Sequence, residues 1–159
     1  MAQKTREEVD AQYKWDLTPL YASTEEWRKA KDALQKRLAE IRNYKGRLAE
    51  SASTLLSYMR LSDSLDKEMS RLYLYASLLS DEDVSNADNM ALTKEMEQVG
   101  IEYDQQADFA RPELSAISDI TYDKYMAEAP GLLDYRMDID AIRRQRPHTL
   151  SEEEEAVLS

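Results

Sequence analysis

The stretch ASTLLSYMRLSDSLDKEMSRLYLYASLLS, residues 52–80, decides the fold that this sequence predicts. It contains no glycine and no proline, and its apolar residues recur mostly at steps of three and four. That spacing places one broad apolar stripe along a helix. The stripe consists of Leu55, Met59, Leu65, Met69, Leu72, Tyr73, Ala76 and Leu79. At about 1.5 Å per residue this helix would be roughly 40 Å long, so we expect other helices to pack along it.

The densest part of this stretch is the run Leu72-Tyr73-Leu74-Tyr75-Ala76, which is apolar or aromatic on nearly every side. We expect such a run to be buried on more than one face of the helix. The run is interpreted as part of a helical core. A cofactor or ligand box is the alternative that the pattern leaves open.

Two more long helices are predicted on either side of the central one. Ser23 and Glu26 form a capping-box pattern before the first, and Gly46 supplies its C-terminal stop. Ser51 or Ser53 would cap the central helix. β-branched residues are few and the chain has three glycines, which disfavours sheet. The sequence therefore predicts an all-α fold, a helical bundle of long antiparallel helices at about 24–44, 52–80 and 85–109, plus shorter C-terminal helices.

The shorter helices are expected at 112–117, 121–128 and 130–145, with Pro112 at a first position, Thr121 as a cap and Pro130 as an opening residue. Ser151 and Glu154 form another capping box, but the helix they begin reaches Ser159 without a C-terminal signal. We therefore expect a flexible N-terminus at 1–12 and one helical lobe at 13–159, cut inside an element at its C-terminal end.

An aromatic segment precedes the first helix and consists of YKWDL at residues 13–17 followed by Thr18-Pro19-Leu20-Tyr21. Its lack of periodicity predicts a strap across a helix face, with Trp15 as the buried anchor. A peptide-binding role for this aromatic residue is the weaker alternative.

The composition excludes several classes of function. Charged residues make up 33% of the chain and the formal net charge is −11, which disfavours binding to nucleic acid or to anionic membranes. No apolar run is long enough for a transmembrane helix, and no secretory signal is visible. Cysteine is absent, which agrees with a reducing compartment, so a cytoplasmic location is expected.

Candidate chemical sites are few. The acidic run Asp81-Glu82-Asp83 lacks the glycine and distal glutamate of an EF-hand loop, so a solvated turn is favoured over a calcium site. Arg143, Arg144 and Arg146 are interpreted as dipole or salt-bridge partners rather than a nucleic-acid patch. His148, the one histidine, is interpreted as a linker residue. With one histidine and no cysteine, we expect no catalytic and no metal-binding residue, and substrate-binding residues stay unknown.

Several motifs in order resemble one family. They are YKWDL with Leu20-Tyr21, Tyr44-Lys45-Gly46, Leu72–Ala76, Asp81–Asp83, FARPEL at 109–114, RQRPHTLS at 144–151 and EAVLS at 155–159. Their order and spacing resemble the N-terminal region of oligoendopeptidase F, a zinc metallopeptidase of the thimet oligopeptidase superfamily. The resemblance covers nearly all of the chain from Tyr13 onward.

The resemblance implies a parent enzyme that cleaves short peptides in an enclosed channel, with zinc held by an H-E-x-x-H helix. This chain has no match to that motif, so no catalytic or zinc-binding residue is carried over. It implies that the chain is the non-catalytic N-terminal lobe, inactive alone, which walls the channel and packs on the catalytic lobe of the same polypeptide. Its substrates would be short peptides. The alternative is a free-standing acidic helical interaction module.

Overall fold

The computed structural model describes residues 9–10 and 13–145, and among these every regular element is helical. The prediction of an all-α fold is confirmed. The chain divides into two compact units, Met1–Glu40 with Ser62–Gln106, and Ile41–Leu61 with Ala107–Ser159. The predicted helix after Ser151 lies outside the described residues. No helix in the described part of the chain is long and apolar enough to cross a membrane.

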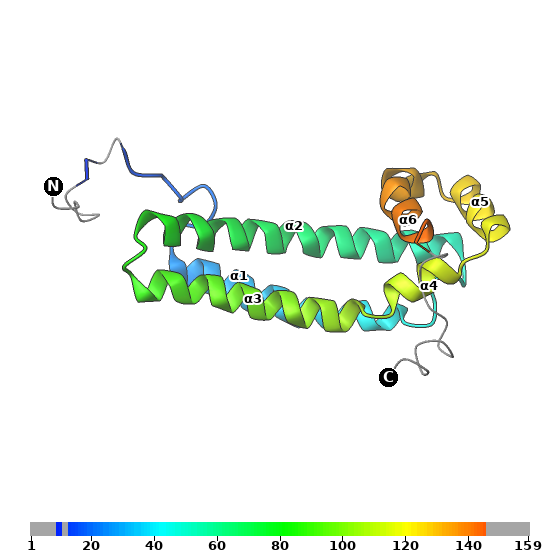
Figure 1. Cartoon of the computed structure of the whole chain (residues 1–159), viewed down its shortest axis with the longest axis horizontal. Helices are drawn as coiled ribbons and strands as arrows, with labels where there is room; N and C mark the ends of the chain where they lie inside the picture. Colours follow the sequence, from blue (N-terminus) through cyan, green and yellow to red (C-terminus); the bar gives the residue numbers. More distant parts are fainter. Residues whose placement is uncertain (1–8, 11–12, 146–159) are drawn as a thin grey trace. The chain divides into compact units, whose positions relative to one another are not determined.

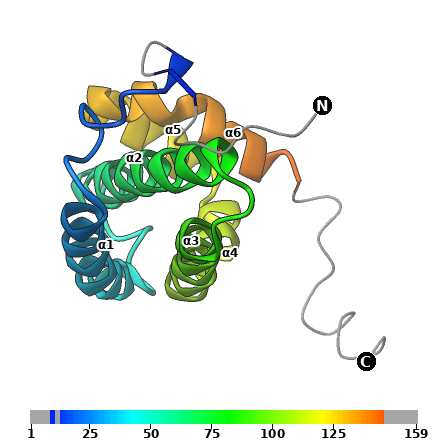
Figure 2. The same ribbon diagram turned by 90° about the vertical axis from the view of Figure 1, so that its left-hand side faces the viewer.

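The first unit contains α1 (Thr24–Leu38), the larger, C-terminal part of α2 (Ala52–Glu82) and nearly all of α3 (Ala87–Ala107). These helices run side by side, and α2 is antiparallel to both α1 and α3 (Figure 1). Viewed from the end, α1 and α3 lie on either side below α2 (Figure 2). Ser23 Oγ accepts a hydrogen bond from the backbone N of Glu26, so the predicted start of α1 is confirmed.

The core of this unit follows the apolar stripe predicted for α2. Its buried side chains are Trp27, Leu34, Leu38, Leu65, Leu72, Tyr75, Ala76, Leu92, Met96 and Val99. Trp27 Nε1 donates a 2.8 Å hydrogen bond to the backbone O of Leu72, and its ring stacks on Tyr75 at 6.5 Å. This bond satisfies the one polar atom of a fully buried indole. The predicted burial of Leu72 is confirmed.

The expectation that the whole run 72–76 is buried is wrong. Tyr73 is 49% exposed and Leu74 is 47% exposed, whereas Leu72, Tyr75 and Ala76 are buried. The helix covers one face of its neighbours, so residues 73 and 74 point away from the buried side even though they are apolar. Isolated apolar side chains on a surface are normal in folded proteins.

The strap before α1 is held by a different residue from the one predicted. Trp15 is 54% exposed, so its assignment as the buried anchor is wrong. Tyr21 packs edge-on against Tyr75 at 5.5 Å, and the Arg71 guanidinium lies 5.1 Å from the Tyr21 ring centroid. Arg71 also donates hydrogen bonds to the backbone O atoms of Pro19 and Leu20, at 3.2 and 2.7 Å. Arg71 therefore holds the strap at two places, the backbone O atoms of Pro19 and Leu20 and the aromatic ring of Tyr21.

Polar side chains link the helices of the first unit across its surface. Lys31 Nζ lies 2.6 Å from Glu95, and Gln35 Nε2 donates to Glu102 at 2.8 Å, so α1 and α3 are tied at two levels. Exposed ion pairs contribute little to stability, because water screens them and ordering the side chains costs entropy. We therefore expect these links to contribute little to the stability of the unit.

The second unit is built from short helices. It contains most of η3 (Ala39–Tyr44), the start of α2, α4 (Ala110–Ala116), α5 (Asp119–Glu128), η4 (Pro130–Tyr135) and α6 (Arg136–Arg143). Its core includes Ile41, Leu48, Leu55, Tyr58, Phe109, Leu114, Ile117, Leu132 and Ile139. Glu113 accepts hydrogen bonds from the backbone N of Gly46 and of Leu48, at 2.5 and 3.2 Å. A carboxylate on α4 thus accepts hydrogen bonds from two backbone N–H groups in the turn between η3 and α2.

Three predicted boundaries in this unit are corrected. α4 begins at Ala110, so Pro112 is its third residue and not its first. Ser118 caps α5 by accepting from the backbone N of Thr121 at 3.1 Å, so Thr121 receives the cap and does not supply it. The single helix predicted from Pro130 is a 3₁₀ helix followed by α6, because the chain turns between Leu132 and Ile139 to bury both.

Gly46 offers a test of the turn before α2. Its φ is +77°, and an added Cβ would meet no atom within 4 Å, so backbone strain is the whole cost of a side chain there. Gly46→Ala is expected to lower the free energy of unfolding by about 1–2 kcal/mol. Gly100→Ala is the matched control, because Gly100 lies inside α3 with equally open space. It should raise the free energy of unfolding by about 0.4–1 kcal/mol. Equal effects in urea titrations would contradict this account.

Candidate functional site

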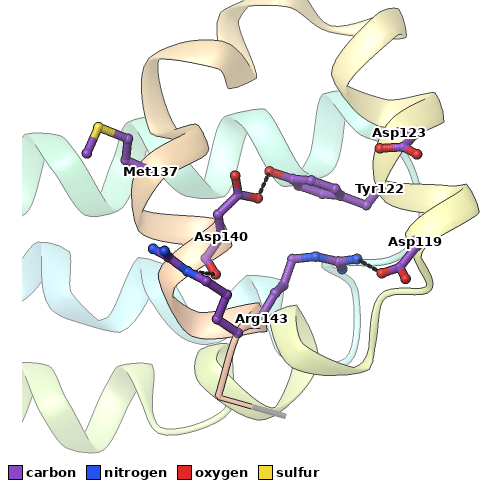
Figure 3. A pocket seen from close by; sticks show the side chains of 7 residues that line it. Asp119, Tyr122, Asp123, Met137, Asp140 and Arg143 are labelled. Carbon is purple, nitrogen blue, oxygen red and sulfur yellow. Dashed lines mark hydrogen bonds and ion pairs between the residues drawn. The ribbon is translucent and has the colours of Figure 1, made fainter. Parts of the chain in front are cut away.

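A polar hollow lies between α5 and α6 in the second unit, with a volume of about 780 Å³. It is lined by Asp119, Tyr122 and Asp123 from α5, Met137, Asp140 and Arg143 from α6, and Arg144 just after α6 (Figure 3). Met137, Asp140 and Arg144 are spaced i, i+3 and i+7, so they lie on one face of α6. The hollow is thus formed by facing sides of two short helices.

Arg143 is the central basic group and is buried. Its guanidinium donates to the backbone O of Ile117 and to Asp119 Oδ1, both at 2.5 Å, and it lies 4.2 Å from the Tyr122 ring centroid. These contacts use a carbonyl at the end of α4, a carboxylate at the start of α5 and an aromatic face. The predicted salt-bridging role of Arg143 is confirmed, and the structure adds the stacking on Tyr122.

Tyr122 connects the two sides of the hollow. Its hydroxyl donates a 2.6 Å hydrogen bond to Asp140 Oδ1, while Arg136 Nε lies 3.4 Å from Asp140 Oδ2. Burial, followed by the hydrogen bond to Asp140, raises the pKa of Tyr122 above its ordinary value of 10.0. The phenol therefore stays protonated and serves as a hydrogen-bond donor, not as a base.

This pKa shift predicts how stability depends on pH. Above about pH 10 the unfolded chain loses the Tyr122 proton while the folded chain keeps it, so the free energy of unfolding falls as pH rises. Tyr122→Phe should cost about 1 kcal/mol at pH 7 through the lost hydrogen bond, and it should flatten the alkaline fall. The measurement is urea unfolding between pH 7 and 11.

Tyr125→Phe is the matched control for this prediction. The Tyr125 hydroxyl donates to the backbone O of Ala49 at 2.7 Å, so the variant loses a hydrogen bond but keeps Tyr122. It should retain the alkaline fall seen in the unchanged chain. An alkaline fall of the same size in Y122F would refute the proposed role of Tyr122.

Two of the three carboxylates that line the hollow are engaged by neighbouring side chains. Asp140 accepts from Tyr122, and Asp119 pairs with Arg143, so neither carboxylate stands ready as a general base. Within residues 9–10 and 13–145, no group of three or more His, Cys, Asp or Glu side chains is placed to hold a metal ion. These residues therefore do not fit the zinc that the family resemblance implies, and no zinc chemistry is assigned to them.

The other candidate residues that the structure describes do not line this hollow. Glu82 accepts from the backbone N of Trp15 at 3.1 Å, and Asp83 accepts from the backbone N and Oγ of Ser85. Asp81 and Glu82 are the last residues of α2, and only Asp83 lies in the turn between α2 and α3, so that turn begins two residues later than predicted. Arg146 and His148 lie outside the described residues.

Sequence reasoning named no residue of this hollow except Arg143 and Arg144. A signal was present, since Met137, Asp140 and Arg144 repeat at helical spacing opposite the buried Ile139. The contribution of α5 could not be read from the sequence. Asp119, Tyr122 and Asp123 face α6 because of the turn through η4, and Pro130 and Gly131 mark that turn without indicating which side of α5 faces α6.

The comparisons with known proteins agree with one another. A family model described as Oligopeptidase F matches residues 113–159. Oligopeptidase PepF of Bacillus subtilis is 33% identical over 157 residues, covering 97% of this chain and 23% of that protein. Group B oligopeptidase PepB of Streptococcus agalactiae is 27% identical over 154 residues, covering 97% of this chain and 26% of that protein.

Solved structures show the same relationship. A putative peptidase from Chlamydophila abortus matches with a TM-score of 0.79 and 27% identity, covering 96% of this chain and 26% of that one. Oligoendopeptidase-F from Enterococcus faecium matches with a TM-score of 0.71 and 29% identity, covering 86% of this chain and 27% of that one. The chain spans about a quarter of the length of the relatives it matches.

Proposed function

Because the chain corresponds to the N-terminal region of oligoendopeptidase F proteins, we propose that it is the non-catalytic N-terminal lobe of such a peptidase. One observation carries this proposal. The similarity to Bacillus subtilis PepF runs along 97% of this chain and yet covers only 23% of that protein. A stretch that matches along its whole length and fills a quarter of a peptidase is expected to be one part of a peptidase.

In this proposal the parent is a zinc endopeptidase that cleaves short peptides, and this lobe forms a wall of the substrate channel. The role is steric, so it needs a stable shape and no reactive group. The packed helices of the first unit and the internally paired polar groups of α5 and α6 support such a role. The net charge of −11 gives the wall an acidic character, which would favour entry of basic peptides.

The channel role is tested by comparing substrates of different size. The full-length polypeptide that carries this chain is incubated with a short quenched-fluorescent peptide, and with the same sequence inserted in a folded protein. We expect the free peptide to be cleaved. A zinc chelator should abolish this cleavage, and added zinc should restore it. The inserted sequence should resist cleavage, because it cannot enter an enclosed channel. Equal cleavage of both substrates would contradict the steric role.

The activity of the parent is tested in the same experiment. Absence of chelator-sensitive cleavage of any peptide by the full-length polypeptide would argue against a zinc peptidase. It would leave the alternative of an acidic helical interaction module.

A further inference from the structure

The strap, residues 13–21, contacts α2 without being buried by it. No residue from 13 to 22 is buried, whereas Tyr75, which the strap contacts, is 5% exposed and Trp27 is 0% exposed. A segment with few buried apolar contacts opens at a smaller cost in free energy than the helices of a core. We therefore expect the strap to leave α2 more readily than α1, α2 and α3 separate from one another.

The strap is held in a turn by hydrogen bonds of its own. Asp16 Oδ1 accepts from the backbone N and from Oγ1 of Thr18, at 3.0 and 2.6 Å. The backbone O of Leu17 accepts from the backbone N of Leu20 and of Tyr21, at 3.0 and 3.2 Å. These bonds lie within the strap and do not involve α2. A segment that is preorganised in this way loses less conformational entropy when it binds to a surface.

Arg71 and Tyr75 of α2 contact the C-terminal end of the strap. Arg71 Nη2 donates hydrogen bonds to the backbone O atoms of Pro19 and Leu20, at 3.2 and 2.7 Å. The Arg71 guanidinium lies 5.1 Å from the Tyr21 ring centroid, and Tyr75 packs edge-on against the same ring at 5.5 Å. The two residues therefore recognise two backbone carbonyls and one aromatic ring. None of these contacts requires that the bound segment belong to the same chain.

The side chain of Tyr75 is fixed from below by the core of the first unit. Its ring stacks on Trp27 at 6.5 Å, and Trp27 Nε1 donates a 2.8 Å hydrogen bond to the backbone O of Leu72. Trp27 and Leu72 are buried without any contribution from strap side chains to that hydrogen bond. A contact surface supported in this way needs little rearrangement before it binds again.

We propose that Arg71 and Tyr75 form a peptide-binding site on α2, which the strap of the same chain occupies reversibly. The ligand class is a short turn such as Asp-Leu-Thr-Pro-Leu-Tyr, residues 16–21, in which two accessible carbonyls precede a tyrosine ring. The strap acts as an intramolecular competitor, so its release decides whether another segment of this kind binds. This proposal does not depend on the proposed function.

The first test measures binding of a fluorescein-labelled peptide, YKWDLTPLYAS from residues 13–23, by fluorescence anisotropy. Tyr21→Ala in the 159-residue chain weakens the internal competitor, which otherwise acts at a high effective concentration. Y21A should therefore bind the peptide about tenfold or more tightly than the unchanged chain does. A peptide that itself carries Tyr21→Ala should lose most of this binding. Equal binding of the unaltered peptide to both chains would overturn the proposal.

The contribution of Arg71 is tested in the Y21A chain. Adding Arg71→Met should weaken peptide binding about tenfold or more, because both carbonyl contacts and the cation over the ring are lost. Adding Lys94→Met instead is the control, since it removes one positive charge from an exposed position on α3. Equal weakening by R71M and K94M would show that net charge governs binding and would overturn the proposal.

The second test uses the unchanged chain and so does not depend on the folding of a variant. A tethered segment acts at an effective concentration in the millimolar range, so unlabelled peptide above about 1 mM should displace the strap. In NMR spectra of the isotope-labelled chain, signals of the strap should then shift. The signal of the Trp27 indole N–H, which is bonded to the backbone O of Leu72, should stay in place.

Two outcomes of the NMR test would overturn the proposal. In the first, the strap signals do not move at any peptide concentration, which means that the strap does not exchange. In the second, they move only together with the Trp27 signal, which means that the first unit unfolds as a whole. Neither test involves hydrolysis, so failure of the peptide-binding site and failure of the proposed function are distinguishable.

Discussion

Leu72→Ala is expected to lower the free energy of unfolding of the first unit by about 2–5 kcal/mol, because it leaves a cavity in a packed core. Leu72 is 1% exposed, and its backbone O accepts the hydrogen bond of the buried Trp27 indole. Trp27 is therefore a local reporter, and its fluorescence during urea unfolding is the measurement.

Leu74→Ala is the control for this prediction. Leu74 lies two residues further along the same helix but is 47% exposed, so its truncation should change stability by less than about 0.5 kcal/mol. The two variants remove the same atoms from α2 and differ in burial. Similar losses for both would show that the stripe through Leu72 is not the core.

Arg143→Met should destabilise the second unit by about 2–4 kcal/mol, because it removes a buried donor and a stacked cation together. The backbone O of Ile117 and the carboxylate of Asp119 lose their partner, and Tyr122 loses the guanidinium on its ring. Methionine keeps much of the side-chain length, so the loss reports mainly on the polar contacts. Amide hydrogen exchange along α5 and α6 measures it directly.

Arg144→Met is the control for Arg143, since it removes the neighbouring charge from the same helix end. Arg144 is exposed, and its Nε bonds to the backbone O of Asp140 at 3.3 Å, so the expected change is within about 0.5 kcal/mol. A comparable acceleration of exchange in R144M would mean that net charge, and not the buried contacts, governs this unit.

The contrast between Leu72 and Leu74 shows how much of the fold could be predicted from the sequence. The 3.6-residue period in 52–80 placed Leu55, Leu65 and Leu72 on the buried side, since periodicity reports a face of a helix. It could not separate Leu72 from Leu74, because an apolar residue on the outer face looks the same in a sequence. Ser23 was identified correctly because a cap depends on local backbone chemistry. The helix predicted at 24–44 is wrong in its end, because α1 stops at Leu38 and a 3₁₀ helix follows; Gly46, with its positive φ, lies in the turn after that 3₁₀ helix.

Contacts between distant segments could not be predicted in the same way. Trp15 is the larger aromatic residue of the strap, but Tyr21 is the one that packs, because Arg71 lies across from it and holds the backbone at Pro19 and Leu20. The hollow likewise depends on the turn through η4, which places α5 opposite α6. The chemistry of Asp119, Tyr122 and Asp140 becomes visible only once those helices face each other.

The most direct test of the central claim is reconstitution of peptide hydrolysis from two separately produced parts. The claim is that this chain is a non-catalytic lobe of a peptidase whose chemistry lies elsewhere in the polypeptide. We expect this chain alone to cleave no short quenched-fluorescent peptide. Mixing it with the rest of the full-length polypeptide should give chelator-sensitive cleavage well above that of either part. Chelator-sensitive cleavage by this chain alone would contradict the account.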